Sequence, residues 1–193
     1  MPMLIDTEER RRELAEHAWD LVSEQGYAAA SVRAVASRAG RNPASVRHVF
    51  PGQEALYIRL SRMLGSRMQH ELRRMTVSAS NPGQALIASL PRDAETIRLW
   101  RVRREVVTHR PTDPSSILVE RMIAQAIERV GAACVARNIF LRPSEAAVTH
   151  GLKAIFEGLV EQLVAPEPVI TRTQAADAIT LHVKLMERPR TRR

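Results

Sequence analysis

Residues 31–50 read SVRAVASRAGRNPASVRHVF, and this stretch decides the fold of the N-terminal part of the chain. Ser31 can cap one short helix, which Gly40 ends in a turn conformation that a Cβ would disfavour. Asn42 and Pro43 then supply the cap and the first-turn proline of a second short helix. Two short helices joined by a glycine turn predict a helix-turn-helix unit.

The inner face of this unit is apolar or small. Ala36 is small where the two helices cross, and the other expected core residues are Val35, Ala39, Val46, Val49 and Phe50. The same twenty residues hold four arginines and no acidic residue. A localised basic surface is typical of proteins that bind polyanions. A merely solvated charged surface is the alternative interpretation.

The whole chain has the composition of a folded globular protein. It contains 193 residues, 45% hydrophobic and 26% charged, with a formal net charge of +8. No apolar run reaches the roughly 20 residues of a membrane helix, and no signal-peptide pattern follows the start. We therefore expect a cytoplasmic protein with no membrane partner. The single Cys134 excludes an internal disulfide framework, and its apolar neighbours favour a core position.

Helix signals recur along the chain and strand signals are nearly absent, so we expect an all-α fold of about nine helices. The predicted helices cover residues 6–25, 31–39, 43–50, 53–75, 84–90, 93–109, 114–137, 144–164 and 171–186. Their predicted caps outside the helix-turn-helix are Asp6, Asp93, Asp113, Ser144 and Thr171. We expect a DNA-binding domain at 1–52, a ligand-binding and dimerisation domain at 53–187 and a basic mobile tail at 188–193.

Residues 10–60 resemble the N-terminal domain of TetR-type transcriptional regulators. The resemblance rests on Glu24-Gln25-Gly26-Tyr27, Ser31-Val32-Arg33-x-Val35-Ala36-x-x-Ala39-Gly40, the seven-residue recognition helix, Phe50 and Glu54-Ala55-Leu56. It covers about a quarter of the chain. This sequence differs from the usual family pattern by Arg41 in place of an aliphatic residue, Pro43-Ala44 in place of Lys-Gly, Arg47 in place of Tyr and Gln53 in place of Lys.

A two-turn recognition helix fits the major groove with its first residues against the base edges. The predicted base-reading residues are Arg41, Asn42, Ala44 and Ser45. Arginine can read guanine, asparagine adenine, and alanine a thymine methyl group. Asn42 is also needed as a cap, so both roles stay open. The predicted backbone contacts are Ser31, Arg33, Arg47 and His48, and the resemblance adds Gln53.

One short recognition helix reads only a few base pairs, so specific binding implies a homodimer on palindromic double-stranded DNA. Helix 144–164 carries a small stripe of Ala147, Gly151, Ala154 and Gly158 beside a large stripe of Val148, Leu152, Ile155 and Leu159. The last helix adds Ala175, Ile179 and Leu185. We expect these two helices to pair with their copies as a four-helix interface; packing within one chain is the alternative.

A looser resemblance concerns the C-terminal part. Leu90-Pro91-x-Asp93-x-Glu95, Trp100-Arg101-Val102, Phe156-Glu157-Gly158-Leu159-x-x-Gln162, Pro166 and Thr171-x-x-Gln174 resemble one subfamily of TetR regulators, some of which respond to choline-like or other small metabolites. The resemblance implies an effector pocket among the middle helices, for which we predict Trp100, Arg104, Met122, Gln125 and Phe156. Arg104 shares an otherwise apolar stripe, where it could meet an anionic ligand, pair with a buried carboxylate or extend to water.

Sequence patterns typical of enzymes are missing. None of the six histidines forms an i, i+4 pair or an H-E-x-x-H motif, and the chain has no P-loop, G-x-S-x-G or G-x-G-x-x-G. We therefore expect no catalytic residues, no metal and no cofactor. The sequence predicts a ligand-responsive DNA-binding regulator, a repressor that an unknown small-molecule effector releases from a palindromic operator. The alternative is a helical metabolite-binding or small enzyme domain with an anionic ligand.

Overall fold

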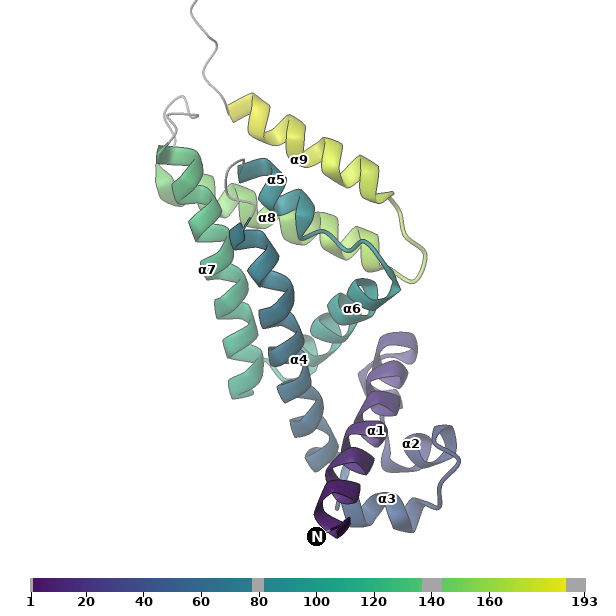
Figure 1. Ribbon diagram of the computed structural model, residues 1–193. Coiled ribbons are helices and arrows are strands. Elements are labelled where there is room, and N and C mark those ends of the chain that lie inside the picture. Colours follow the sequence, from purple (N-terminus) through teal and green to yellow (C-terminus); the bar gives the residue numbers. More distant parts are fainter. Residues whose placement is uncertain (1, 78–81, 137–143, 187–193) are drawn as a thin grey trace, which may run out of the picture. The chain divides into compact units, whose positions relative to one another are not determined.

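The computed structural model describes residues 2–77, 82–136 and 144–186, and these residues form nine α-helices, one turn of 3-10 helix and no strand (Figure 1). The α-helices are α1 (Pro2–Gln25), α2 (Val32–Arg38), α3 (Pro43–Val49), α4 (Gln53–Val77), α5 (Pro82–Ala88), α6 (Ala94–His109), α7 (Pro114–Ala136), α8 (Glu145–Val164) and α9 (Arg172–Met186). The all-α prediction is confirmed. The predicted tail at 188–193 lies outside the described residues.

Most predicted caps are present. Asp93 accepts a hydrogen bond from Thr96 N at 2.8 Å, Asp113 from Ser115 N at 2.9 Å and Ser144 from Ala147 N at 3.3 Å. Thr171 and Gln174 form a reciprocal capping box, in which each side chain accepts from the other backbone N–H. The predicted start at Asp6 is wrong: α1 begins at Pro2, because the helical pattern continues upstream, and Asp6 lies inside it.

The described residues fall into two compact units. The first comprises Met1–Arg67 with Arg98–Leu118, and the second comprises Met68–Ile97 with Val119–Arg193. The N-terminal part of α4, up to Arg67, therefore falls in one unit with the helix-turn-helix and with residues 98–118. The functional division after residue 52 stays a prediction.

The first unit has its core where α1, α2, α3 and α4 meet. Its buried side chains include Leu14, Trp19, Val22, Val35, Ala36, Val46, Phe50, Leu56, Leu60 and Leu64. Burial of such side chains contributes about 1.5–3 kcal/mol each relative to exposure, and it fixes which faces of the short α2 and α3 point outward. Gly26 ends α1 with φ +88°, a left-handed conformation that glycine adopts without strain.

The second unit has a separate core. It includes Met68, Met75, Leu86, Ile123, Ile127, Cys134, Leu152, Phe156 and Ile179. Cys134 has no exposed surface, which confirms the core interpretation. Helices α7 and α8 approach closely at Gly131, where an added Cβ would lie 2.5 Å from Thr149 Oγ1.

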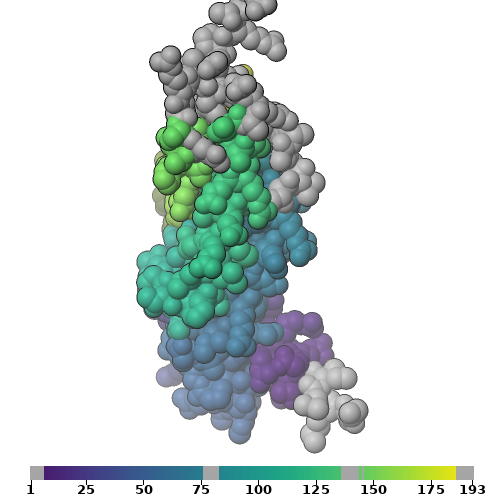
Figure 2. Space-filling model, turned by 90° about the vertical axis from the view of Figure 1, so that its left-hand side faces the viewer, coloured from purple at the N-terminus to yellow at the C-terminus, as the bar shows by residue number. Residues whose placement is uncertain are grey.

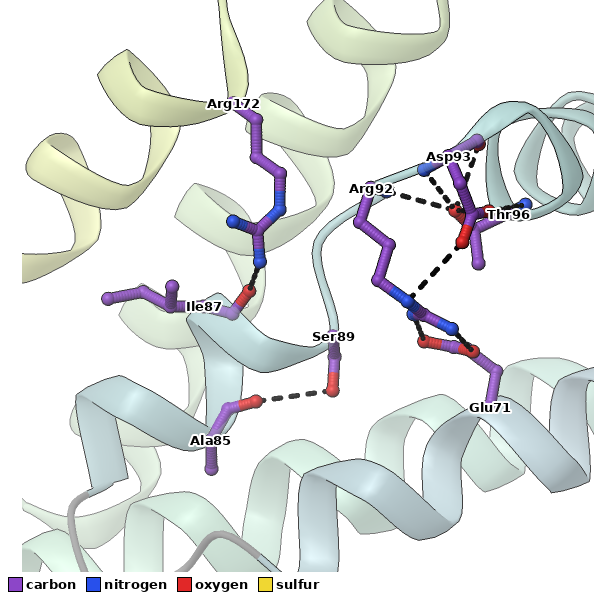
Figure 3. A network of polar contacts seen from close by, with 8 residues as sticks. All are labelled: Glu71, Ala85, Ile87, Ser89, Arg92, Asp93, Thr96 and Arg172. Carbon is purple, nitrogen blue, oxygen red and sulfur yellow. Dashed lines mark hydrogen bonds and ion pairs between the residues drawn. The ribbon is translucent and has the colours of Figure 1, made fainter.

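A polar network holds the segment between α5 and α6 against α4 in the second unit (Figure 3). Arg92 donates to both carboxylate oxygens of Glu71, at 2.5 and 3.2 Å, and Glu71 is 4% exposed. This carboxylate raises the pKa of Arg92 above its usual value. Arg172 of α9 donates to the carbonyl of Ile87 at 2.9 Å, which ties α9 to the end of α5.

No helix within the described ranges combines the length and the apolar character that a bilayer crossing requires.

Candidate nucleic-acid interface

The turn between α2 and α3 has the tight geometry that its sequence predicts. Gly40 has φ +61°, and the backbone N–H of Arg41 donates to the carbonyl of Ala36 at 2.9 Å. Val46 and Val49 are buried against the core, so the opposite face of α3 is left to solvent. Helix α3 therefore packs on the core through one face and exposes its other face to solvent.

An ion pair fixes α2 to α1. Arg38 donates to both oxygens of Glu24, at 2.7 and 2.8 Å, and lies 3.9 Å from Asp20. The hydrogen bonds from Arg38 lower the pKa of Glu24 below its usual value. One of the four arginines of the helix-turn-helix is thus used within the protein, and Arg33, Arg41 and Arg47 remain exposed.

The predicted base-reading residues lie together at the start of α3. Asn42 caps the helix, with Oδ1 accepting from Ala44 N at 2.8 Å, and it is exposed. Ser45 is half-buried, and its hydroxyl donates to the carbonyl of Asn42 at 2.7 Å. Ala44 and Arg41 are exposed. The capping role of Asn42 is observed, and its base contact stays a prediction.

The predicted backbone contacts flank this group. Ser31 caps α2 by accepting from Ala34 N at 3.1 Å and is half-buried, and Arg33 beside it is exposed. Arg47 and His48 are exposed on the last turn of α3. Gln53 is exposed at the first position of α4 and donates to the hydroxyl of Tyr57. All nine predicted residues belong to the first unit, at the start of α2, in α3 and the turn before it, and at the start of α4. Their contacts with DNA stay a prediction.

An acidic side of α1, which the sequence analysis missed, lies next to the turn. Glu13 is 3.6 Å from the Arg41 guanidinium, and both side chains are nearly half exposed. A hollow of about 440 Å³ is lined by Glu9, Arg10, Arg12, Glu13, Glu16 and Arg41. The sequence could have predicted this acidic side, because Glu9, Glu13 and Glu16 follow the i, i+4, i+7 spacing of one helix face.

A second missed feature is an aromatic stack in the first unit. The Tyr27 ring lies 4.0 Å from that of Tyr57 and 4.7 Å from that of His109, nearly parallel to both. The Tyr57 hydroxyl donates to the Tyr27 carbonyl at 3.1 Å, and Tyr27 N donates to Glu105 at 3.0 Å. Burial raises the pKa of Tyr27 above its usual value. The stack joins the end of α6 to the segment between α1 and α2.

A bidentate ion pair reinforces this junction. Arg110, just after α6, donates to both oxygens of Glu54 in the first turn of α4, at 2.6 and 2.7 Å. These bonds lower the pKa of Glu54 and raise that of Arg110. Asp113 lies 3.4 Å from the same guanidinium. The start of α4, one residue from predicted DNA contact Gln53, is therefore held by the end of α6.

The five predicted ligand-binding residues are not gathered in one cavity of either unit. Trp100 and Phe156 are 1% and 0% exposed and belong to different units. Arg104 lies 3.5 Å from Glu105 with 31% of its side chain exposed. Met122 and Gln125 line one pocket of about 290 Å³ in the second unit. All five stay predictions as ligand contacts, and the burial of Trp100 and Phe156 shows that both side chains also serve in the protein core.

The predicted dimer residues differ in how much of each side chain is exposed to solvent. Leu152 and Ile179 are 0% exposed and Leu159 is 9% exposed, because they pack inside the chain. Their place in a dimer interface stays a prediction. Ala147, Ala154 and Gly158 are exposed, and Gly151 and Ile155 are half-buried. On α9, Leu181 and Leu185 are 58% and 72% exposed. Leu181 was missed by the sequence analysis.

These features define a helix-turn-helix protein: a buried three-helix core presents one short, basic, exposed helix, and a helical second unit follows. Residues 14–60 match the family described as "Bacterial regulatory proteins, tetR family". Over these residues, the N-terminal domain of the chain is similar to that of the TetR family.

One curated relative supports this assignment. The chain is 31% identical over 106 residues to the HTH-type transcriptional regulator PksA of Bacillus subtilis (strain 168), and the match covers 53% of this chain and 52% of PksA. The chain thus matches about half the length of that relative.

Solved structures share the fold over nearly the full length. A transcriptional regulator from Saccharomonospora viridis, solved in complex with choline, has a TM-score of 0.72 at 19% identity, with 92% of this chain and 96% of that chain covered. The ketosteroid transcriptional regulator KstR2 of Mycobacterium tuberculosis has a TM-score of 0.72 at 18% identity, with 93% and 96% covered. Both proteins are described as transcriptional regulators, and at these identities the likeness concerns the fold.

Proposed function

We propose that the chain binds double-stranded DNA as a homodimer, with one α3 of each copy in the major groove, and that it represses transcription until a small-molecule effector releases it. The observation that supports this most directly is the seating of α3: its inner face is buried and its outer face, with Arg41, Asn42, Ala44 and Arg47, is exposed. A helix so placed can enter the major groove without rearrangement of the core.

The test is a DNA-binding titration. Full-length protein is titrated into labelled duplexes from upstream of its own and neighbouring genes, at about 50 to 200 mM salt. Six to ten phosphate contacts per dimer predict a loss of affinity on the order of 10³-fold or more across that range. We expect one or a few fragments to be preferred over scrambled duplexes at every salt concentration. Equal affinity for all fragments, or no dependence on salt, contradicts the proposal.

The contacts at the end of α6 could transmit effector binding to the helix-turn-helix and so release the protein from DNA. The Tyr27 stack and the Arg110–Glu54 pair fix the end of α6 to both the segment before α2 and the start of α4. An effector that favours another position of α6 therefore also changes the placement of α3. In a dimer, the two α3 helices must fit half-sites about 34 Å apart, so a small shift lowers affinity.

The proposed dimer surface is the exposed face of α8 and α9. Ala147, Ala154 and Gly158 allow close approach of a helix, and Leu181 and Leu185 supply apolar area that the single chain leaves in water. Exposed apolar area of this kind favours association.

Replacement of Leu181 by aspartate is expected to convert the dimer to a monomer, because it places a charge in an apolar interface. Sedimentation velocity reports the mass directly. Leu118→Asp is the matched control, since Leu118 is 51% exposed on α7, and it is expected to leave the dimer intact. A wild-type monomer, or equal effects of both variants, contradicts the assigned surface.

Replacement of Glu13 by glutamine is expected to tighten binding to any duplex about threefold to tenfold. The change frees the Arg41 guanidinium from its ion pair and removes a negative charge beside the groove-facing turn. Anisotropy titrations of a scrambled duplex measure this. Glu8→Gln serves as the control, because Glu8 pairs with Arg11 on α1 and is not in the Arg41 hollow. Weaker binding by Glu13→Gln would show that Glu13 holds Arg41 in its productive position.

A further inference from the structure

The pocket between α4 and α7 in the second unit has a chemistry that the proposed function leaves open. It measures about 290 Å³, which is room for on the order of ten water-sized groups. Figure 2 shows α7 in green on the surface turned toward the viewer, with α4 in blue beside it. All of its lining residues belong to the second unit, so the pocket is complete within that unit.

The floor of this pocket is apolar and its rim is cationic. Leu72 and Ala126 are 6% and 3% exposed and form the floor with half-buried Met122. Arg73 from α4 and Arg129 from α7 stand at the rim, and both are exposed. None of the lining residues is acidic. Two guanidiniums at one pocket make it a site of positive potential.

The remaining lining residues add neutral hydrogen-bonding groups. Gln69 on α4 and Gln125 on α7 are exposed at the pocket, and each amide offers two donors and one acceptor oxygen. Arg129 is exposed, and its planar guanidinium has the geometry to bind an oxyanion. A cationic ligand is disfavoured here, because the rim is positive and no aromatic ring lines the pocket.

From this arrangement we infer that the pocket binds a small organic anion, whose negatively charged oxygens lie on Arg73 and Arg129 and whose short apolar part lies on Leu72, Met122 and Ala126. The inference rests on the proposed function in one respect: it assigns this anion as the effector. Binding itself does not require DNA.

Calorimetric titration of the full chain without DNA tests the binding. The probes are sodium hexanoate, hexyl phosphate, acetate and hexylammonium chloride. We expect hexanoate or hexyl phosphate to bind, acetate to bind more weakly because it lacks the apolar part, and hexylammonium not to bind. Whichever of hexanoate and hexyl phosphate binds more tightly shows whether the site prefers a carboxylate or a phosphate.

Variants locate the site. Arg129→Gln is expected to weaken binding of the preferred anion about tenfold, since it removes a charged donor. Arg121→Gln, an exposed position on α7 outside the pocket, is the matched control and is expected to change affinity less than twofold. Equal binding of hexylammonium and hexanoate, binding by neither anion, or equal effects of the two variants overturns the inference.

A second titration separates this inference from the proposed function. If the anion binds and lowers the affinity for the preferred duplex in wild type but not in Arg129→Gln, the pocket is the effector site. If it binds without changing that affinity, the anion site stands and its effector role is overturned. If no duplex is preferred over scrambled DNA, the proposed function fails while the calorimetric result is unaffected.

Discussion

Simultaneous replacement of Arg41 and Ser45 by alanine is expected to remove most of the discrimination between the preferred duplex and a scrambled one. Arg41 is exposed in the turn before α3, and Ser45 is half-buried in the first turn of α3, the part of a recognition helix from which side chains reach base edges. A bidentate base contact supplies about 1–3 kcal/mol of discrimination, or roughly fivefold to 150-fold per half-site. In a dimer the loss counts at both half-sites. The measurement is the ratio of the two dissociation constants at one salt concentration.

Two controls give this result its meaning. Arg62→Ala removes an exposed arginine of α4 outside the helix-turn-helix, and it is expected to leave the ratio unchanged. Arg47→Ala is expected to weaken both duplexes about equally and to reduce the salt slope, because a phosphate contact carries no sequence information. Dimerisation should survive in all three variants. An unchanged ratio in the double variant means that α3 does not read bases with these residues.

Local features of the fold could be predicted from the sequence because their partners are a few residues away. The caps at Ser31, Asn42 and Asp93 each join groups two or three positions apart, and the glycine turn needs no partner. The predicted start of α1 was wrong because the capping pattern at Asp6 is also compatible with a position inside a helix. A cap signal indicates where a helix can begin, not that it must.

The features that position the candidate site depend on pairs far apart in the sequence. Arg110 and Glu54 are 56 residues apart, and Tyr27 and Glu105 are 78 apart. No spacing rule joins such residues, because their contact depends on how helices pack. The same limit applies to the predicted ligand contacts Trp100 and Phe156, which stay untested. A large aromatic residue on an apolar stripe suits a pocket wall and a core equally well, and only the packing decides.

Replacement of Arg92 by alanine is expected to lower the free energy of unfolding by about 3 kcal/mol, because it leaves the carboxylate of Glu71 buried without its cation. Glu71 is 4% exposed, whereas 29% of the Arg92 side chain is exposed. Glu71→Ala should therefore cost less, about 1–2 kcal/mol, since Arg92 can turn to water. Urea unfolding followed by circular dichroism measures both values.

The double variant decides whether the pair acts as a unit. If Arg92 matters because it neutralises Glu71, the loss in Arg92→Ala/Glu71→Ala falls short of the sum of the single losses by at least about 1 kcal/mol. Arg172→Ala is the control in the same network, where an exposed side chain gives one hydrogen bond to the Ile87 carbonyl, and its expected cost is about 1 kcal/mol. Additive losses would place the stabilisation in the packing of each side chain instead. Coupled losses would make this ion pair the main attachment of the α5–α6 segment to α4.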